Sequence, residues 1–164
     1  MTNRSAFPLR PALLVCTLFV SQCALPTPPG PTSSPVSTRL SGVLSECAFV
    51  EGASVDQRIT TFARMDEASF ESMLAVSRAR RWSFRLDGEL KDRLLRSLSQ
   101  SRFTPWPAPD IRARLDFLDE RHKSLGVLWL NNTAEVLSFE GVNFSVSGSL
   151  SKHLLAIAWP SSAL

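Results

Sequence analysis

The stretch that decides the fold is residues 113–146, ARLDFLDERHKSLGVLWLNNTAEVLSFEGVNFSV. Apolar and polar residues alternate from Ala113 to Phe117, the pattern of a strand with one buried face. Further short β-compatible segments, separated by polar turns, follow at 125–130, 136–139 and 142–146. Strands joined by turns this short pair antiparallel, so the sequence predicts a four-stranded C-terminal meander.

The remaining elements are predicted before and after this meander in the sequence. They are a hairpin of strands 43–50 and 58–64 turning at 51–54, a helix from Asp66 closed by Arg78 and Arg80, a strand over 82–86, a helix from Asp87, a loop over 103–109, and a last helix from Ser149 to Trp159. The fold class is therefore expected to be α+β, with an antiparallel sheet and about three helices packed on one of its faces.

The first 23 residues have the composition of an export signal. Arg4 and Arg10 form a basic start, and an apolar run follows from Ala12 to Val20. The run is about half as long as the ~20 apolar residues that a membrane-spanning helix needs. We therefore expect a signal peptide over residues 1–23.

The end of the signal, Val20-Ser21-Gln22-Cys23, resembles the lipobox of bacterial lipoproteins. The resemblance implies that Cys23 becomes the first mature residue and carries a lipid, including a palmitate chain. Gln22 departs from the pattern, which has a small residue before the cysteine. An ordinary signal cut after Cys23, without a lipid, is the alternative. Ala24 follows the cysteine, where enteric lipoproteins of the inner membrane have aspartate, and the resemblance therefore implies the outer membrane.

Residues 24–39 are rich in proline, serine and threonine. Such a segment donates few backbone hydrogen bonds and buries little apolar surface, so we expect a disordered tether. At about 3 Å per residue it gives roughly 40 Å of reach. The predicted organisation is a signal peptide, this tether and a single globular domain over residues 40–160.

Composition excludes several classes of function. Removal of Arg4 and Arg10 with the signal leaves 16 of the 18 basic residues against 15 acidic ones, so nucleic-acid binding is not expected. No cofactor or metal motif is present, and Cys47 remains as the one cysteine of the domain, expected to be a small buried residue. The two histidines are His122, in a charged turn, and His153, beside an apolar helix stripe.

Two groups of residues are candidates for binding a partner. Phe103 and Trp106, in a proline-interrupted segment, are rigid aromatic anchors if they are exposed. Arg80 and Arg81 belong to an arginine-rich part of the chain that suits an acidic partner or lipid phosphates.

The predicted function is that of a non-enzymatic, lipid-anchored protein of the bacterial envelope. It is expected to face the periplasm from the outer membrane and to act through contacts with another envelope protein. One alternative is a small hydrolase or peptidoglycan-modifying enzyme, which needs His122 or His153 beside a serine or Cys47. The other alternative is a soluble periplasmic inhibitor or ligand-binding module, which needs a closed apolar pocket.

Overall fold

The computed structural model describes residues 34–55, 64–75 and 79–160. These ranges contain four helices and one antiparallel sheet of seven strands, which confirms the predicted α+β class. The helices are α1 (Pro35–Glu46), α2 (Glu67–Ala75), α3 (Gly88–Gln100) and α4 (Leu150–Ala158). The strands are β1 (Phe49–Val55), β2 (Ala79–Arg85), β3 (Arg102–Pro105), β4 (Ala113–Leu118), β5 (Ser124–Leu130), β6 (Val136–Phe139) and β7 (Val142–Ser147).

The predicted meander is confirmed. The strand order is β2-β1-β4-β5-β6-β7-β3, so four strands consecutive in the chain are also neighbours in the sheet. Asn131 fixes the turn between β5 and β6, because its side-chain Oδ1 accepts backbone hydrogen bonds from Glu135 at 3.0 Å and Val136 at 3.1 Å. This is the local side-chain bonding that makes asparagine a turn residue.

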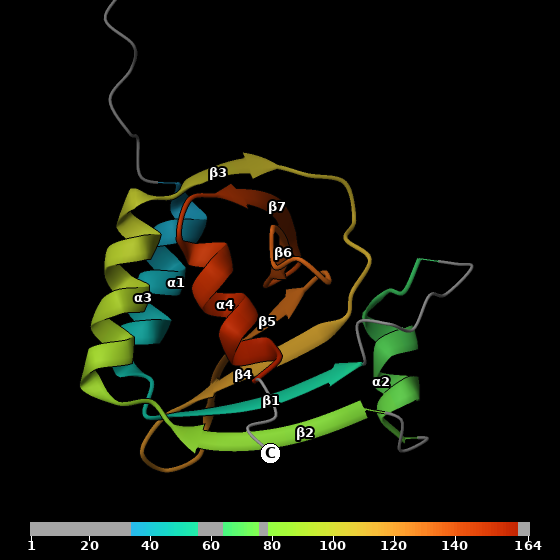
Figure 1. The fold of residues 1–164 in the computed structure, drawn as a ribbon, viewed down its shortest axis with the longest axis horizontal. Helices are drawn as coiled ribbons and strands as arrows, with labels where there is room; N and C mark the ends of the chain where they lie inside the picture. The colour runs from blue at the N-terminus through green and yellow to red at the C-terminus, as the bar shows by residue number, and fades with distance from the viewer. Residues whose placement is uncertain (1–33, 56–63, 76–78, 161–164) are drawn as a thin grey trace, which may run out of the picture. The chain divides into compact units, whose positions relative to one another are not determined.

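The two faces of the sheet carry different helices. The main core lies between one face and α1, α3 and α4, which lie on the same side of the sheet (Figure 1). Phe117 of β4, Leu44 of α1 and Leu154 of α4 are among its fully buried members. Helix α2 packs on the other face, where Phe70 and Leu74 join a second cluster. Three helices thus share a face, but they are not the three predicted ones, because α1 was not expected and the predicted helix after Asp66, α2, covers the opposite face.

Helix α1 corrects two predictions about residues 35–50. The tether was predicted to reach residue 39, and a strand to begin at Val43, but residues 35–46 are helical. Pro35 occupies the first helical position, where a backbone N–H would have no partner within the helix, so its absence in proline costs no hydrogen bond. Leu40 and Leu44, four residues apart, turn one buried stripe toward the core.

The predicted hairpin over residues 43–64 is wrong. Its proposed turn, Glu51–Ser54, is the middle of β1, which pairs with β2 on one side and β4 on the other. Gly52 resembled a turn residue but has a packing role, because the indole of Trp82 lies directly against its Cα. Residues 58–63 of the second predicted strand lie outside the described residues.

The helix starts at Asp66 and Asp87 are confirmed. Asp66 accepts a hydrogen bond from the Ser69 N–H at 2.8 Å, and Asp87 accepts one from the Leu90 N–H at 2.7 Å. These carboxylates satisfy N–H groups that have no partner within the helix. Arg80 does not close α2 as predicted but lies in β2, and Arg78 is outside the described residues.

Strand β3 corrects the predicted loop over residues 103–109. Residues 102–105 pair with β7 and form one edge of the sheet, where Pro105 is tolerated because an edge strand leaves some N–H positions unpaired. Helix α4 begins after Ser149, as predicted, but the hydroxyl of Ser149 donates to Ser97 Oγ at 3.0 Å and does not cap the helix.

Candidate functional site

The residues that the sequence singled out for binding do not form one surface. Arg80 and Arg81 lie in β2, whereas Phe103 lies in β3 and Trp106 follows it directly. These two strands are the opposite edges of the seven-stranded sheet. The aromatic and basic candidates are therefore two separate features.

The aromatic pair is itself divided. Phe103 is half-buried, with its ring centroid 5.4 Å from that of Phe144 in the main core, so it does not meet the condition of exposure on which a role as an anchor depends. Trp106 is 48% exposed, and its backbone N–H donates to the carbonyl oxygen of Asn143 at 3.2 Å. Trp106 alone keeps the predicted character of an exposed aromatic residue on a fixed backbone.

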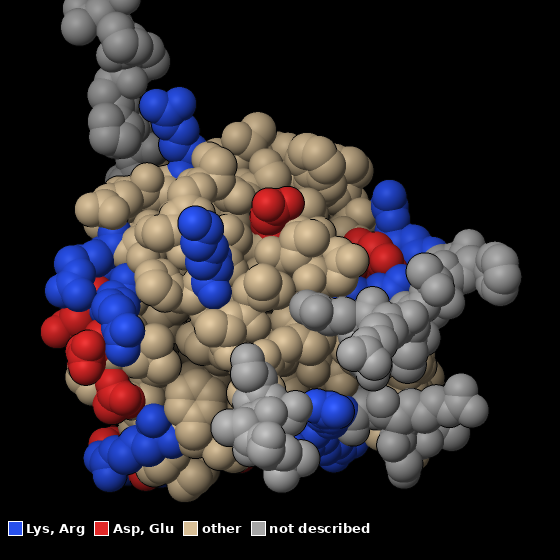
Figure 2. Space-filling model, in the orientation of Figure 1, with Lys and Arg blue, Asp and Glu red and all other residues tan. Residues whose placement is uncertain are grey.

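The described residues of the arginine-rich segment do not form a continuous basic patch. Arg80 and Arg81 are neighbours on a strand and so project to opposite faces of the sheet. Arg85 forms an ion pair with Glu120 at 2.9 Å, and Arg93 forms one with Glu89 at 3.5 Å. Figure 2 shows the positive side chains on the visible face interspersed with negative ones or separated by uncharged surface.

A pocket of about 440 Å³ lies on the face that α2 covers. We call it the α2 pocket. Its floor consists of β2, β1 and β4, and α2 forms one wall. Five charged side chains line it: Glu51, Glu71, Arg81, Arg114 and Asp116. This lining differs from the closed apolar pocket that the ligand-binding alternative requires.

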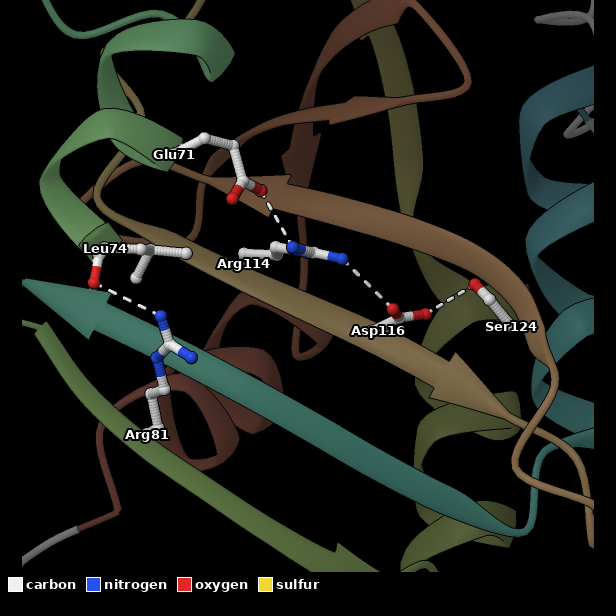
Figure 3. Close-up of polar contacts among 6 residues, drawn as sticks. All are labelled: Glu71, Leu74, Arg81, Arg114, Asp116 and Ser124. Atoms are coloured by element: carbon white, nitrogen blue, oxygen red, sulfur yellow. Dashed lines mark hydrogen bonds and ion pairs between the residues drawn. The ribbon is translucent and has the colours of Figure 1, made fainter.

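Arg114 is the centre of a polar network in this pocket (Figure 3). Its guanidinium donates to Glu71 Oε1 at 2.8 Å and to Asp116 Oδ2 at 3.1 Å. The other oxygen of Asp116 accepts from Ser124 Oγ at 2.6 Å, and the guanidinium lies 5.5 Å from the ring centroid of Trp129. Contacts on several sides hold this cation in one orientation, and the two carboxylates exceed its charge by one negative charge.

Local sequence explains how α2 reaches this position. The Asp66 cap starts the helix, and Phe70 and Leu74 are buried against the sheet one turn apart. Glu71 follows Phe70 and so projects from the side of the helix over Arg114. At the helix end, the Leu74 carbonyl accepts a hydrogen bond from Arg81 Nη2 at 3.2 Å, which places a cation where the helix dipole is negative.

Sequence reasoning found Arg81 but missed the rest of this pocket. Its charged residues come from β1, α2, β2 and β4 and are separated by long stretches of chain. In the sequence, polar residues that alternate with core residues along a strand cannot be distinguished from residues that face solvent, even where a helix covers them. The one available signal was that Arg114 and Asp116 alternate with the buried positions of β4.

The candidate nucleophile and histidines are not brought together. Cys47 is fully buried, its thiol donates to the Phe49 carbonyl at 3.0 Å, and burial raises its pKa. His122 is exposed with its ring centroid 4.5 Å from that of Phe49, and His153 is half-buried on α4. In the described ranges neither histidine side chain is hydrogen-bonded to Cys47 or to a serine hydroxyl.

Two findings concern metals and membranes. Within residues 34–55, 64–75 and 79–160, no group of three or more His, Cys, Asp or Glu side chains is placed to hold a metal ion. None of the described helices combines the length and apolar character needed to cross a bilayer. Cys23, the predicted lipidation site, lies outside the described residues.

Comparisons of this chain with protein-family models, curated proteins and solved structures give no match.

Proposed function

We propose that this protein is a lipid-anchored bacterial envelope protein that acts by binding a partner. The observation that carries the proposal is the order of segments along the chain. A basic and apolar start leads to Cys23, a proline-rich segment follows, and a folded domain begins with α1 at Pro35. A lipid, a spacer and a domain in this order make a tethered module.

The position of α1 supports this arrangement. Leu40 and Leu44 fix the helix in the main core, so a pull on the spacer acts on a helix that is packed into the domain. The proposed spacer is residues 24–34, of which 24–33 lie outside the described residues, and an extended chain of that length would reach roughly 34 Å at about 3 Å per residue. Helix α1 begins beside β3, whereas α2 and its pocket lie away from that point (Figure 1).

Fractionation tests the anchor. Wild-type protein is expected in the membrane pellet, from which detergent releases it, and to incorporate labelled palmitate. Cys23→Ala is expected to lose the label and to move to the soluble fraction. Cys16→Ala, in the apolar part of the same signal, is the matched control and keeps both properties. Membrane association of Cys23→Ala equal to that of the wild type contradicts the proposal.

Crosslinking tests the binding role at a defined position. A photo-crosslinking amino acid in place of Trp106 is expected to give one discrete adduct in intact cells, because exposed tryptophans are favoured at binding centres. The same amino acid at Lys152, exposed on α4, is the control and is expected to give none. Equal adducts from both positions, or none from either, count against a binding surface at Trp106.

A further inference from the structure

The charged side chains of the α2 pocket divide into a paired set and an unpaired set. Arg114 forms ion pairs with Glu71 and Asp116, and these three groups make up the paired set. Arg81 donates one hydrogen bond, to the neutral Leu74 carbonyl, and has no carboxylate partner among the described residues. The carboxylate of Glu51 has neither an ion pair nor a hydrogen bond within the same ranges.

The two unpaired groups are close neighbours on one face of the sheet. Glu51 of β1 pairs with Ser83 of β2, and Ala53 pairs with Arg81, so Glu51 and Arg81 occupy diagonal positions. Side chains in such positions start about 7 Å apart. Both line the pocket, and Figure 3 shows Arg81 directed from β2 toward the end of α2. A cation and an anion therefore face the same cavity without forming an ion pair.

We propose that the α2 pocket binds a zwitterionic α-amino-acid head group. The ligand carboxylate accepts hydrogen bonds from the free edge of the Arg81 guanidinium, and the ligand ammonium donates to Glu51. With a hydrogen bond at each end, such a head group spans about 9 Å between the two protein groups. Flexible glutamate and arginine side chains on diagonal positions reach across that distance. This inference does not depend on the lipid anchor.

The charge balance of the pocket favours a zwitterion over an ion of one sign. Three carboxylates and two guanidinium groups line it, so a simple anion meets an excess of negative charge. A simple cation satisfies Glu51 but leaves Arg81 without a counter-charge. A ligand that carries both charges satisfies both groups. Ala53 and Leu74 supply the apolar part of the lining, against which the ligand side chain packs.

The volume also suits a small ligand. A pocket of about 440 Å³ falls in the range of roughly 300–1,000 Å³ that is usual for small-molecule sites. The fixed orientation of Arg114 keeps one wall of the pocket in place before a ligand arrives. Preorganisation of this kind reduces the ordering that binding requires.

The test is a ligand-observed magnetic resonance titration of the full mature chain in detergent with three matched probes. Alanine carries both charges, N-acetylalanine carries the carboxylate alone, and alaninamide carries the ammonium alone. Methionine and its two corresponding derivatives repeat the comparison with a larger side chain. At least one of the two zwitterions is expected to bind, with its single-charge derivatives at least about tenfold weaker, a loss of about 1.4 kcal/mol.

Variants assign the binding to this pocket. Arg81→Met and Glu51→Gln are each expected to weaken binding of the zwitterion at least tenfold. Arg80→Met, on the opposite face of the same strand, and Glu46→Gln, exposed on α1, are the matched controls and keep wild-type affinity. All four positions are exposed, and unchanged circular dichroism spectra and urea midpoints verify that the variants fold.

Three results overturn the proposal. They are no binding of either zwitterion at about 10 mM, which corresponds to a binding free energy weaker than about −3 kcal/mol, equal binding of a single-charge derivative, and wild-type affinity in Arg81→Met or Glu51→Gln. Equal binding of alaninamide identifies a cation site at Glu51, and equal binding of N-acetylalanine identifies an anion site at Arg81.

Discussion

Replacing Gly52 by alanine tests the packing between β1 and β2. A Cβ atom at Gly52 stands 2.2 Å from both Cε2 and Cζ2 of Trp82 and 2.6 Å from its Nε1. Cβ atoms essentially never come closer than 3.0 Å and ordinary contact begins at 3.4 Å, so the indole has to move by 0.8 Å at least and by 1.2 Å to reach ordinary contact. Trp82 packs against the main core and its Nε1 is buried, so this movement disturbs a filled region.

The expected destabilisation follows from two opposing effects. Overpacking of a filled site costs about 1–3 kcal/mol. Alanine in place of glycine recovers about 0.4–1 kcal/mol, because it restricts the unfolded chain. Gly52→Ala is therefore expected to lower the free energy of unfolding by about 1.3 kcal/mol, the difference between the middles of the two ranges, and by at most about 2.6 kcal/mol.

Urea unfolding of the mature chain, followed by far-ultraviolet circular dichroism, measures this change. Gly42→Ala in α1 is the matched control, because a Cβ atom there meets nothing within 4 Å. In a helix this substitution is expected to raise the free energy of unfolding by about 0.5–1 kcal/mol. The same chemical change thus has opposite signs at the two positions.

A double-mutant cycle identifies the cause. Trp82→Ala removes the obstacle, so Gly52→Ala in that background is expected to be neutral or slightly stabilising, which gives a coupling of about 1–3 kcal/mol. An equal loss from Gly52→Ala with and without Trp82 refutes the reasoning, and so does a Gly52→Ala protein as stable as Gly42→Ala.

The remaining predictions concern a thiol and two carboxylates. Cys47, buried and with a raised pKa, is expected to react with iodoacetamide at least about 10³-fold more slowly in the folded chain than in urea, as measured by mass spectrometry; equal rates contradict its burial. Hydrogen bonds from Ser69 lower the pKa of Asp66, and backbone hydrogen bonds, first that of Lys123, lower the pKa of Asp119. Both carboxyls therefore stabilise the fold above their unfolded pKa, and this contribution is lost as the pH falls below about 4. Asp66→Asn keeps the helix cap and is expected to make the acid side of the stability profile shallower; an unchanged slope refutes the assignment.

The elements predicted correctly from the sequence are those with a local physical signal. The meander has alternating strands and turn residues such as Asn131, and α3 has a capping aspartate at Asp87 with a leucine stripe behind it. These signals depend on neighbours within a few residues, so no tertiary information was needed.

The failures occurred where tertiary contacts decide the local structure. Gly52 has the sequence character of a turn residue, because the sequence does not show that Trp82 packs on it, 30 positions further on. Pro35 resembles a tether residue in the sequence, because a proline at the first helical position differs from a linker proline only through the leucines that follow. The α2 pocket was missed because Glu71 and Arg114 meet across 43 positions of sequence.

The mass of the mature N-terminus tests the central claim, a lipid-anchored domain, most directly. The account predicts that the mature chain begins at Cys23 and carries a diacylglyceryl group and an amide-linked acyl chain, so that its N-terminal peptide is heavier than its sequence by the mass of three fatty-acyl chains and a glycerol unit. A mature chain that begins at Ala24, or at Cys23 with an unmodified thiol, would contradict it.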